Sequence, residues 1–162
     1  GAKNGTAKIW PSARWQSLIT MILKKTQARL VAVGDQAQWH VTRDILRDSK
    51  RSRNLTGQTT LTELAAVIFD CDVLVSGDSG PLHLATALGK RVVGIYGPTD
   101  PRLSGPFADD SKIVTAGIPC SPCYDLQAPA DCPFGDILCM DWIQPEKVFE
   151  SVLGQIGATV RK

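Results

Sequence analysis

The residues best suited to chemistry lie in one run of the chain, Val75-Ser76-Gly77-Asp78-Ser79-Gly80-Pro81-Leu82-His83-Leu84. A short apolar strand at 73–75 leads into a turn of small residues, and a helix is expected from 81 to 88. The first N–H groups of such a helix have no partners within it, and together with the helix dipole they favour an anion. The run therefore predicts a site for a phosphorylated ligand, although a helix that is merely capped has the same pattern.

Each residue type suits this turn for its own reason. Ser79 is a good N-cap, Gly80 lets a bulky ligand approach the backbone, and Pro81 needs no partner for its nitrogen in a first turn. His83 falls in the same turn and can point at the ligand, although a lone histidine there is often only a surface residue.

A second apolar strand follows at 92–96 and ends in Gly97-Pro98-Thr99-Asp100-Pro101. Ligands of open parallel sheets bind beyond the carboxyl ends of the strands. Two successive strands that end in small and polar residues predict such a crevice. Gly97, Thr99 and Asp100 are expected to shape it rather than to do chemistry.

Apolar positions alternate between helical and strand patterns over the whole chain. Helices are predicted from 11 to about 23, at 38–47, after the capping box of Thr60 and Glu63, and at 145–156, where Leu153 should face inward. Strands are predicted at 29–33, 73–75, 92–96 and 112–115, with loops at 98–110 and 118–143. The expected fold is a Rossmann-like, doubly wound α/β domain over residues 1–162, with one parallel sheet covered on both faces.

Composition excludes several classes of function. A chain of 162 residues with 43% hydrophobic residues fits one globular domain, and its apolar stretches are too short for a membrane span. A formal charge of +2 is too small to indicate nucleic-acid binding. The run Lys50-Arg51-Ser52-Arg53 is expected to be a solvated loop, and nothing at the start of the sequence indicates export.

Motifs in a fixed order give the chain a family resemblance. Asp78-Ser79-Gly80-Pro81-Leu82-His83 with Tyr96-Gly97-Pro98-Thr99-Asp100-Pro101 resembles the sugar-nucleotide domain of the bacterial ADP-heptose:lipopolysaccharide heptosyltransferases, glycosyltransferase family nine. Lys8-Ile9-Trp10-Pro11, Asn54-Leu55-Thr56-Gly57 and a later Cys-bearing segment are similar to that family in the same order.

The resemblance implies the C-terminal half of a two-domain glycosyltransferase of the B fold type. The implied ligand is ADP-heptose, with these donor-binding residues: Lys8, Asp35, Asp78, Ser79, Gly80, Pro81, Leu82 and His83. It also implies inverting transfer without a metal or cofactor, and no catalytic residue in this half. In that family Gly1-Ala2 would follow directly on a first strand that is not in this sequence, so either the sequence was trimmed or an edge of the sheet is missing.

Further implications concern the rest of the enzyme. The lipid A-Kdo acceptor and the catalytic base would belong to an N-terminal half, so this domain alone should be inactive. The implied location is the cytoplasm, with peripheral contact to the inner face of the inner membrane.

Alternatives remain open at this point. Asp35 followed by Gln36 stands where the family has a carboxylate near the adenosine, yet Asp after Gly is also an ordinary turn residue. The same half-fold suits a UDP-sugar transferase or epimerase, or a non-catalytic Rossmann-like binding module.

The cysteines form a separate pattern. Cys120, Cys123, Cys132 and Cys139 lie in the long loop 118–143, and Cys71 is expected to be a small buried residue. The four loop thiols could be free, form two disulfides or bind one structural zinc. They are expected to lie at the periphery, away from the phosphate-binding turn.

Overall fold

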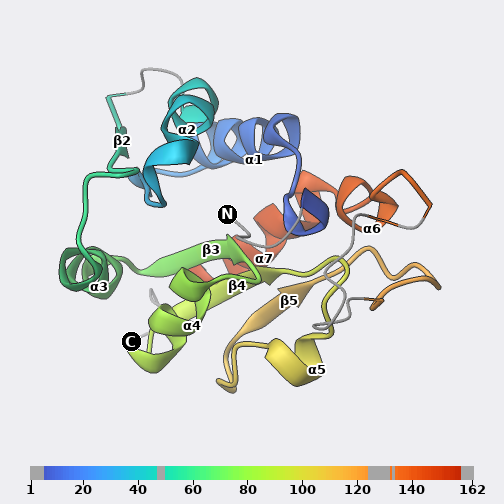
Figure 1. Cartoon of the computed structure of the whole chain (residues 1–162). Helices are drawn as coiled ribbons and strands as arrows, with labels where there is room; N and C mark the ends of the chain where they lie inside the picture. The colour runs from blue at the N-terminus through green and yellow to red at the C-terminus, as the bar shows by residue number, and fades with distance from the viewer. Residues whose placement is uncertain (1–5, 47–49, 124–131, 133, 158–162) are drawn as a thin grey trace.

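The computed structural model describes residues 6–46, 50–123, 132 and 134–157. Helices alternate with parallel strands through this part of the chain (Figure 1). The elements follow in the order η1 (Thr6–Lys8), α1 (Ser12–Lys25), β1 (Leu30–Ala32), η2 (Gln36–Gln38), α2 (Trp39–Leu46), β2 (Ser52–Asn54), α3 (Leu61–Asp70), β3 (Val73–Gly77), α4 (Gly80–Ala87), β4 (Arg91–Ile95), α5 (Pro101–Ser104), β5 (Lys112–Val114), α6 (Leu138–Asp141) and α7 (Pro145–Gly157).

Strands β3, β4 and β5 form one parallel sheet in that order. Gly77 lies opposite Ile95, and Ile95 lies opposite Val114, so the carboxyl ends of the three strands meet at one edge. The residues that follow β3 and β4, Asp78 and Tyr96, are therefore placed next to each other.

Strand β4 shows why this sheet is covered on both faces. Val93 and Ile95 belong to a core that includes buried residues of α1 and α7, whereas Val92 belongs to a second core with residues of α3 and α4. Side chains of a strand alternate between the two faces, so each face needs its own helical layer. The predicted doubly wound α/β fold with parallel strands is confirmed.

The sheet is not continuous, however, which corrects the expectation of one sheet. β1 and β2 form a separate parallel pair, while β1 still contributes Leu30 to the core that contains Val73 and Val75 of β3. Among the described residues, the interruption thus lies between β1 and β3. In Figure 1, α1, α2 and β2 lie above β3–β5 in the view.

Several local predictions are confirmed, and others are wrong. The capping box of Thr60 and Glu63 begins α3 as predicted. The supposed solvated loop at 50–53 contains the start of β2, and its Arg51 guanidinium donates to the carbonyls of Leu23 and Thr26 at the end of α1. The two predicted loops contain the short helices α5 and α6, and Leu153 is 41% exposed. Helix α7 shows the reason, since Val148, Phe149 and Val152 already form its buried stripe.

Among the described residues, no helix has both the length and the apolar content needed to cross a membrane.

Candidate functional site

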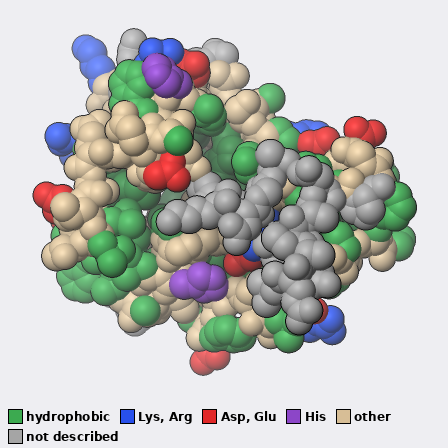
Figure 2. Space-filling view, viewed as in Figure 1, with side chains coloured by type: hydrophobic (Ala, Val, Ile, Leu, Met, Phe, Trp, Pro, Cys, Tyr) green, Lys and Arg blue, Asp and Glu red, His purple; other side chains and the backbone are tan. Residues whose placement is uncertain are grey.

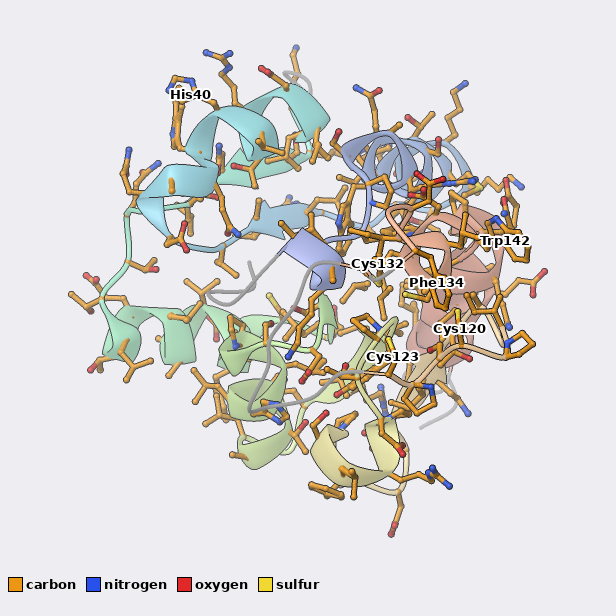
Figure 3. All side chains as sticks on the ribbon, turned by 45° about the vertical axis from the view of Figure 1, so that its right-hand side comes forward. His40, Cys120, Cys123, Cys132, Phe134 and Trp142 are labelled. Carbon is orange, nitrogen blue, oxygen red and sulfur yellow. The ribbon has the colours of Figure 1, made fainter. Side chains whose placement is uncertain are left out.

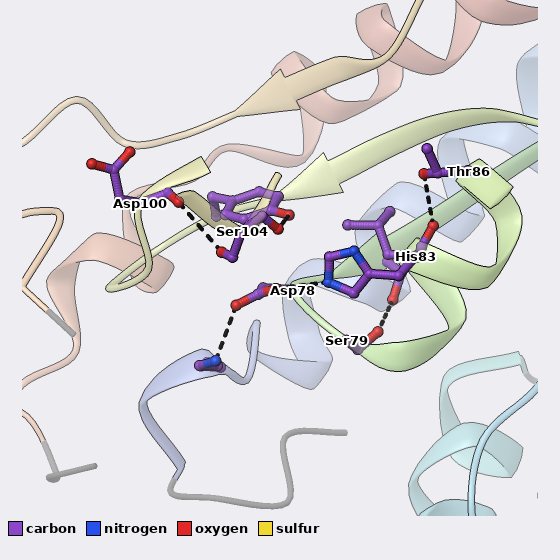
Figure 4. A network of polar contacts seen from close by, with 10 residues as sticks. Asp78, Ser79, His83, Thr86, Asp100 and Ser104 are labelled. Atoms are coloured by element: carbon purple, nitrogen blue, oxygen red, sulfur yellow. Dashed lines mark hydrogen bonds and ion pairs between the residues drawn. The ribbon is translucent and has the colours of Figure 1, made fainter. Parts of the chain in front are cut away.

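The site centres on the Asp78 carboxylate, which lies between two cationic or ionisable side chains (Figure 4). Lys8 donates from Nζ to Asp78 Oδ2 at 3.0 Å, and His83 Nε2 lies 3.5 Å from Oδ1. The Asp78 side chain is only 8% exposed and that of Lys8 16%, whereas that of His83 is 47% exposed. A carboxylate withdrawn from water in this way needs a charged partner, and Lys8 supplies one.

Three elements bring these residues together. Lys8 ends η1, Asp78 follows β3, and His83 lies in the first turn of α4. The Cβ position of Gly77 lies 3.5 Å from the Lys8 carbonyl oxygen, which places the end of η1 in contact with the end of β3. Lys8 and Asp78 are 70 positions apart in the sequence, so only the fold could show that they pair.

The described residues leave the N-terminus of α4 accessible. Apart from the chain neighbours of Gly80 and the backbone of α4 itself, no described heavy atom lies within 4 Å of the position that a Cβ on Gly80 would occupy, and Gly80 is exposed. Pro81 is in the first turn as predicted, and Leu82 is fully buried, so its side chain packs in the core rather than against a ligand.

The role predicted for Ser79 needs correction. Ser79 has the extended backbone of an N-cap residue, but its side chain makes no capping hydrogen bond. Its hydroxyl is instead 2.8 Å from the Ser76 hydroxyl. The side chain therefore does not occupy the N–H donors at the start of the helix.

Tyr96 is a part of this site that the sequence analysis missed. Burial, and secondarily the nearby Asp78 carboxylate, raise the pKa of the Tyr96 phenol. Its hydroxyl donates to the Ser104 carbonyl at 2.8 Å, which ties β4 to the end of α5. In sequence, Tyr96 looks like the last apolar residue of a strand, and only its place beside the carboxyl end of β3 relates it to Asp78.

The residues after β4 that were expected to shape the cleft cap a helix or are buried against neighbouring side chains. Asp100 caps α5 by accepting from Arg102 N at 2.9 Å, and its hydrogen bonds with Arg102 lower the pKa of its carboxyl group. Thr99 is buried, and its hydroxyl has no hydrogen-bond partner among the described residues. Gly97 is also buried, and a Cβ there would stand 2.3 Å from Met140 Sδ. A hollow of about 210 Å³ adjoins this segment, lined by 99–102, Thr115, Gly117, Ser121 and Pro122.

Asp35 is not part of the Asp78 cluster. It follows β1 and precedes η2, it is exposed, and its side chain makes no capping hydrogen bond. It lies at the carboxyl end of a strand in the other parallel pair.

The described parts of the cysteine loop contact the segment that follows β4, and the separation of the loop from the phosphate-binding turn stays a prediction. Ser121 Oγ donates to the Gly97 carbonyl at 2.6 Å, and Cys123 N donates to the Pro98 carbonyl at 2.8 Å. At the other end of the loop, the buried Cys139 Sγ lies next to Gly97. Both ends of the loop therefore pack against the segment after β4.

The thiols are not in disulfides in this structure, and Cys71 is half-buried. Figure 3 shows Cys120, Cys123 and Cys132 on the side of the molecule that carries Phe134, far from His40. No three described His, Cys, Asp or Glu side chains are arranged to hold a metal ion. The state of the four loop thiols in solution stays a prediction, which a thiol count with metal analysis tests.

Lysine and arginine side chains are scattered over the surface face shown in Figure 2 and form no continuous patch there. Within the described residues of the candidate site, Lys8 supplies a positive charge directly beside Asp78.

Comparison with known proteins decides the family. The model of glycosyltransferase family 9 (heptosyltransferase) matches residues 1–133. The chain belongs to this family. It is 29% identical over 157 residues to the lipooligosaccharide heptosyltransferase 2 of Campylobacter jejuni (strain 81116), covering 94% of this chain and 48% of that protein.

Solved structures of family members share the fold. The Escherichia coli ADP-heptose lipopolysaccharide heptosyltransferase II matches 99% of this chain and 45% of its own, with a TM-score of 0.77 and 25% identity. The E. coli heptosyltransferase WaaC with ADP matches 95% of this chain and 42% of its own, with a TM-score of 0.71 and 20% identity. These matches cover most of this chain. The chain itself spans only about half the length of these relatives.

Proposed function

We propose that this chain is the donor-binding half of a heptosyltransferase, which holds ADP-heptose while a second domain presents the lipopolysaccharide inner core. Family membership supports the transferase class. Two structures similar in fold, E. coli heptosyltransferase WaaC with ADP and with ADP-2-deoxy-2-fluoro heptose, support this kind of ligand.

The observation that carries the proposal is the buried Asp78 carboxylate with Lys8 and His83 beside the open N-terminus of α4. Transfer breaks the bond between the anomeric carbon of the sugar and the diphosphate, so negative charge grows on the leaving diphosphate. Backbone N–H groups at a helix N-terminus and a fixed ammonium group stabilise such charge without rearrangement. Asp78 holds the Lys8 ammonium in place for this purpose.

The remaining donor contacts extend this assignment. Asp78 and His83 are the proposed contacts to the donor sugar and phosphates, with Ser79 and Gly80 contributing backbone donors. Asp35 is the proposed contact to the adenosine ribose, because it lies exposed at the carboxyl end of β1. The half-chain would then bind the diphosphate through β3–α4 and the nucleoside through β1–η2.

The acceptor and the catalytic base are proposed to belong to the other half of the enzyme. The 162-residue chain should therefore bind the nucleotide weakly and transfer no sugar. The proposed setting is the cytoplasm, at the inner face of the inner membrane, where a lipid acceptor would be reached. Measurable heptose transfer by the purified chain would refute this division of labour.

Calorimetry with ADP, UDP and GDP on the same preparation tests the proposal. We expect measurable heat with ADP and little with UDP or GDP. Preference for UDP would indicate a UDP-sugar transferase or epimerase. No binding of any nucleotide, by a chain that circular dichroism shows to be folded, would indicate a non-catalytic module.

A further inference from the structure

The turn that follows β2 holds the segment that follows β1. This turn, residues 54–57, is one of the motifs similar to the family. Gly57 N donates to the Gly34 carbonyl at 2.9 Å, which continues the pairing of β1 with β2 beyond the ends of both strands. The turn is therefore bonded to the residue directly before Asp35, the proposed contact to the adenosine ribose.

A buried polar network lies beneath this turn. Thr56 is fully buried, and its hydroxyl lies 3.0 Å from that of Thr42. Asn54 Oδ1 accepts from Thr56 N at 3.0 Å, and Asn54 Nδ2 donates to the Trp39 carbonyl at 3.4 Å. The Thr42 hydroxyl also lies 2.9 Å from the Gln38 carbonyl. Side chains of the turn are thus linked to the end of η2 and the start of α2, and a satisfied buried network rigidifies the elements that it joins.

Gly57 sets how closely η2 approaches the turn. Its φ of 72° is in the left-handed region, which L side chains rarely adopt. A Cβ at this position would stand 2.7 Å from the Cα of Gln36, the first residue of η2. Because that Cα is a backbone atom, a side chain at position 57 requires η2 to move away. Such a movement would displace Asp35, which is the N-cap residue of η2.

We propose that Thr56 and Gly57 are positioning residues of the nucleoside subsite, because they fix η2 and η2 sets where Asp35 meets the ribose. The inference rests on the proposed function, since it requires a bound nucleotide. Asp35 and Asp78 follow strands of two separate sheets. A displacement of η2 should therefore weaken the contacts to the nucleoside and leave those to the diphosphate in place.

NMR titration of the isotope-labelled 162-residue chain separates the two subsites, because ADP carries a nucleoside and a diphosphate, whereas inorganic pyrophosphate carries only the latter. Gly57→Ala is the test variant. Gly89→Ala is the matched control, because Gly89 has a similar φ of 69° after the end of α4, and a Cβ there would meet no described atom within 4 Å.

We expect Gly57→Ala to raise the Kd for ADP about tenfold or more, towards that for pyrophosphate, through loss of a hydrogen bond to the Asp35 carboxylate. The Kd for pyrophosphate, followed at the amides of Ser79 and Gly80, should change less than about twofold, because the diphosphate contacts stay in place. Gly89→Ala should change neither Kd.

Thr56→Val and Thr56→Ser test the buried hydroxyl, and they decide the matter if Gly57→Ala does not fold. Valine keeps the shape of the side chain without the hydroxyl, whereas serine keeps the hydroxyl. We expect Thr56→Val to raise the Kd for ADP about threefold or more with that for pyrophosphate unchanged, and Thr56→Ser to bind ADP as the unaltered chain does.

Three results would overturn the inference while the proposed function stands. They are an unchanged Kd for ADP in the folded variants, an equal loss of affinity for ADP and pyrophosphate, and a loss in Gly89→Ala as large as in Gly57→Ala. The last would show that backbone strain alone weakens binding. No binding of ADP by the folded, unaltered chain would instead refute the proposed function, and this inference with it.

Discussion

Removing the Lys8 ammonium tests the link between the buried ion pair and anion binding. Two unit charges 3.0 Å apart attract by about 5 kcal/mol at an effective dielectric constant of about 20. Both side chains are largely removed from water, and this desolvation offsets most of the attraction. We therefore expect Lys8→Met and Asp78→Asn each to lower the free energy of unfolding by about 1–2 kcal/mol. The double variant should lose less than the sum, because neither charge is then left unpaired.

Nucleotide affinity separates a binding role from a structural one. A hydrogen bond to a charged group contributes about 1.5–3 kcal/mol, so Lys8→Met should raise the Kd for ADP about 10- to 150-fold. Asp78→Asn should raise it less, because it misplaces the ammonium without removing it. The measurements are denaturant unfolding and calorimetry, with the exposed Lys24→Met as the matched control. An unchanged Kd in a folded Lys8→Met variant would show that the pair is structural only.

Three further predictions concern single residues. His83→Ala should weaken ADP binding about tenfold or more with little change in melting temperature, since the side chain is half-exposed; unfolding of this variant would instead assign His83 to the core. Gly97→Ala should cost about 1–3 kcal/mol in denaturant unfolding, because the new methyl group meets Met140 Sδ, whereas Gly154→Ala, which meets nothing within 4 Å, should not destabilise α7. Burial raises the pKa of the Cys139 thiol to about 11. Unfolded thiols ionise near pH 9, so the folded state holds more protons above that pH. The free energy of unfolding should fall by up to about 3 kcal/mol as pH rises from 9 to 11, and less steeply in Cys139→Ala.

The sequence by itself determined the elements and the turn that carries the site. Apolar runs and helix caps predicted the parallel α/β fold. In a fold of this class each helix buries one face and each strand buries both, and these requirements leave recognisable apolar patterns in the sequence. The small residues after the strand at 73–75 indicated a helix N-terminus that can accept an anion. This feature depends only on the residues at the start of the helix and on its unpaired N–H groups. The short strand β2 was missed because Ser52-Arg53-Asn54 is polar, and it pairs only because β1 lies beside it.

Tertiary structure decided which residues meet. The pairing of Lys8 with Asp78, the place of Tyr96 beside that carboxylate and the contact of the cysteine loop with Gly97 all join positions distant in sequence or on different elements. Sequence periodicity carries no information on such distances. The sequence also could not show that β1 and β3 are unpaired. Strand order depends on how the crossover connections pass around the sheet, and the residue pattern of a single strand does not determine it.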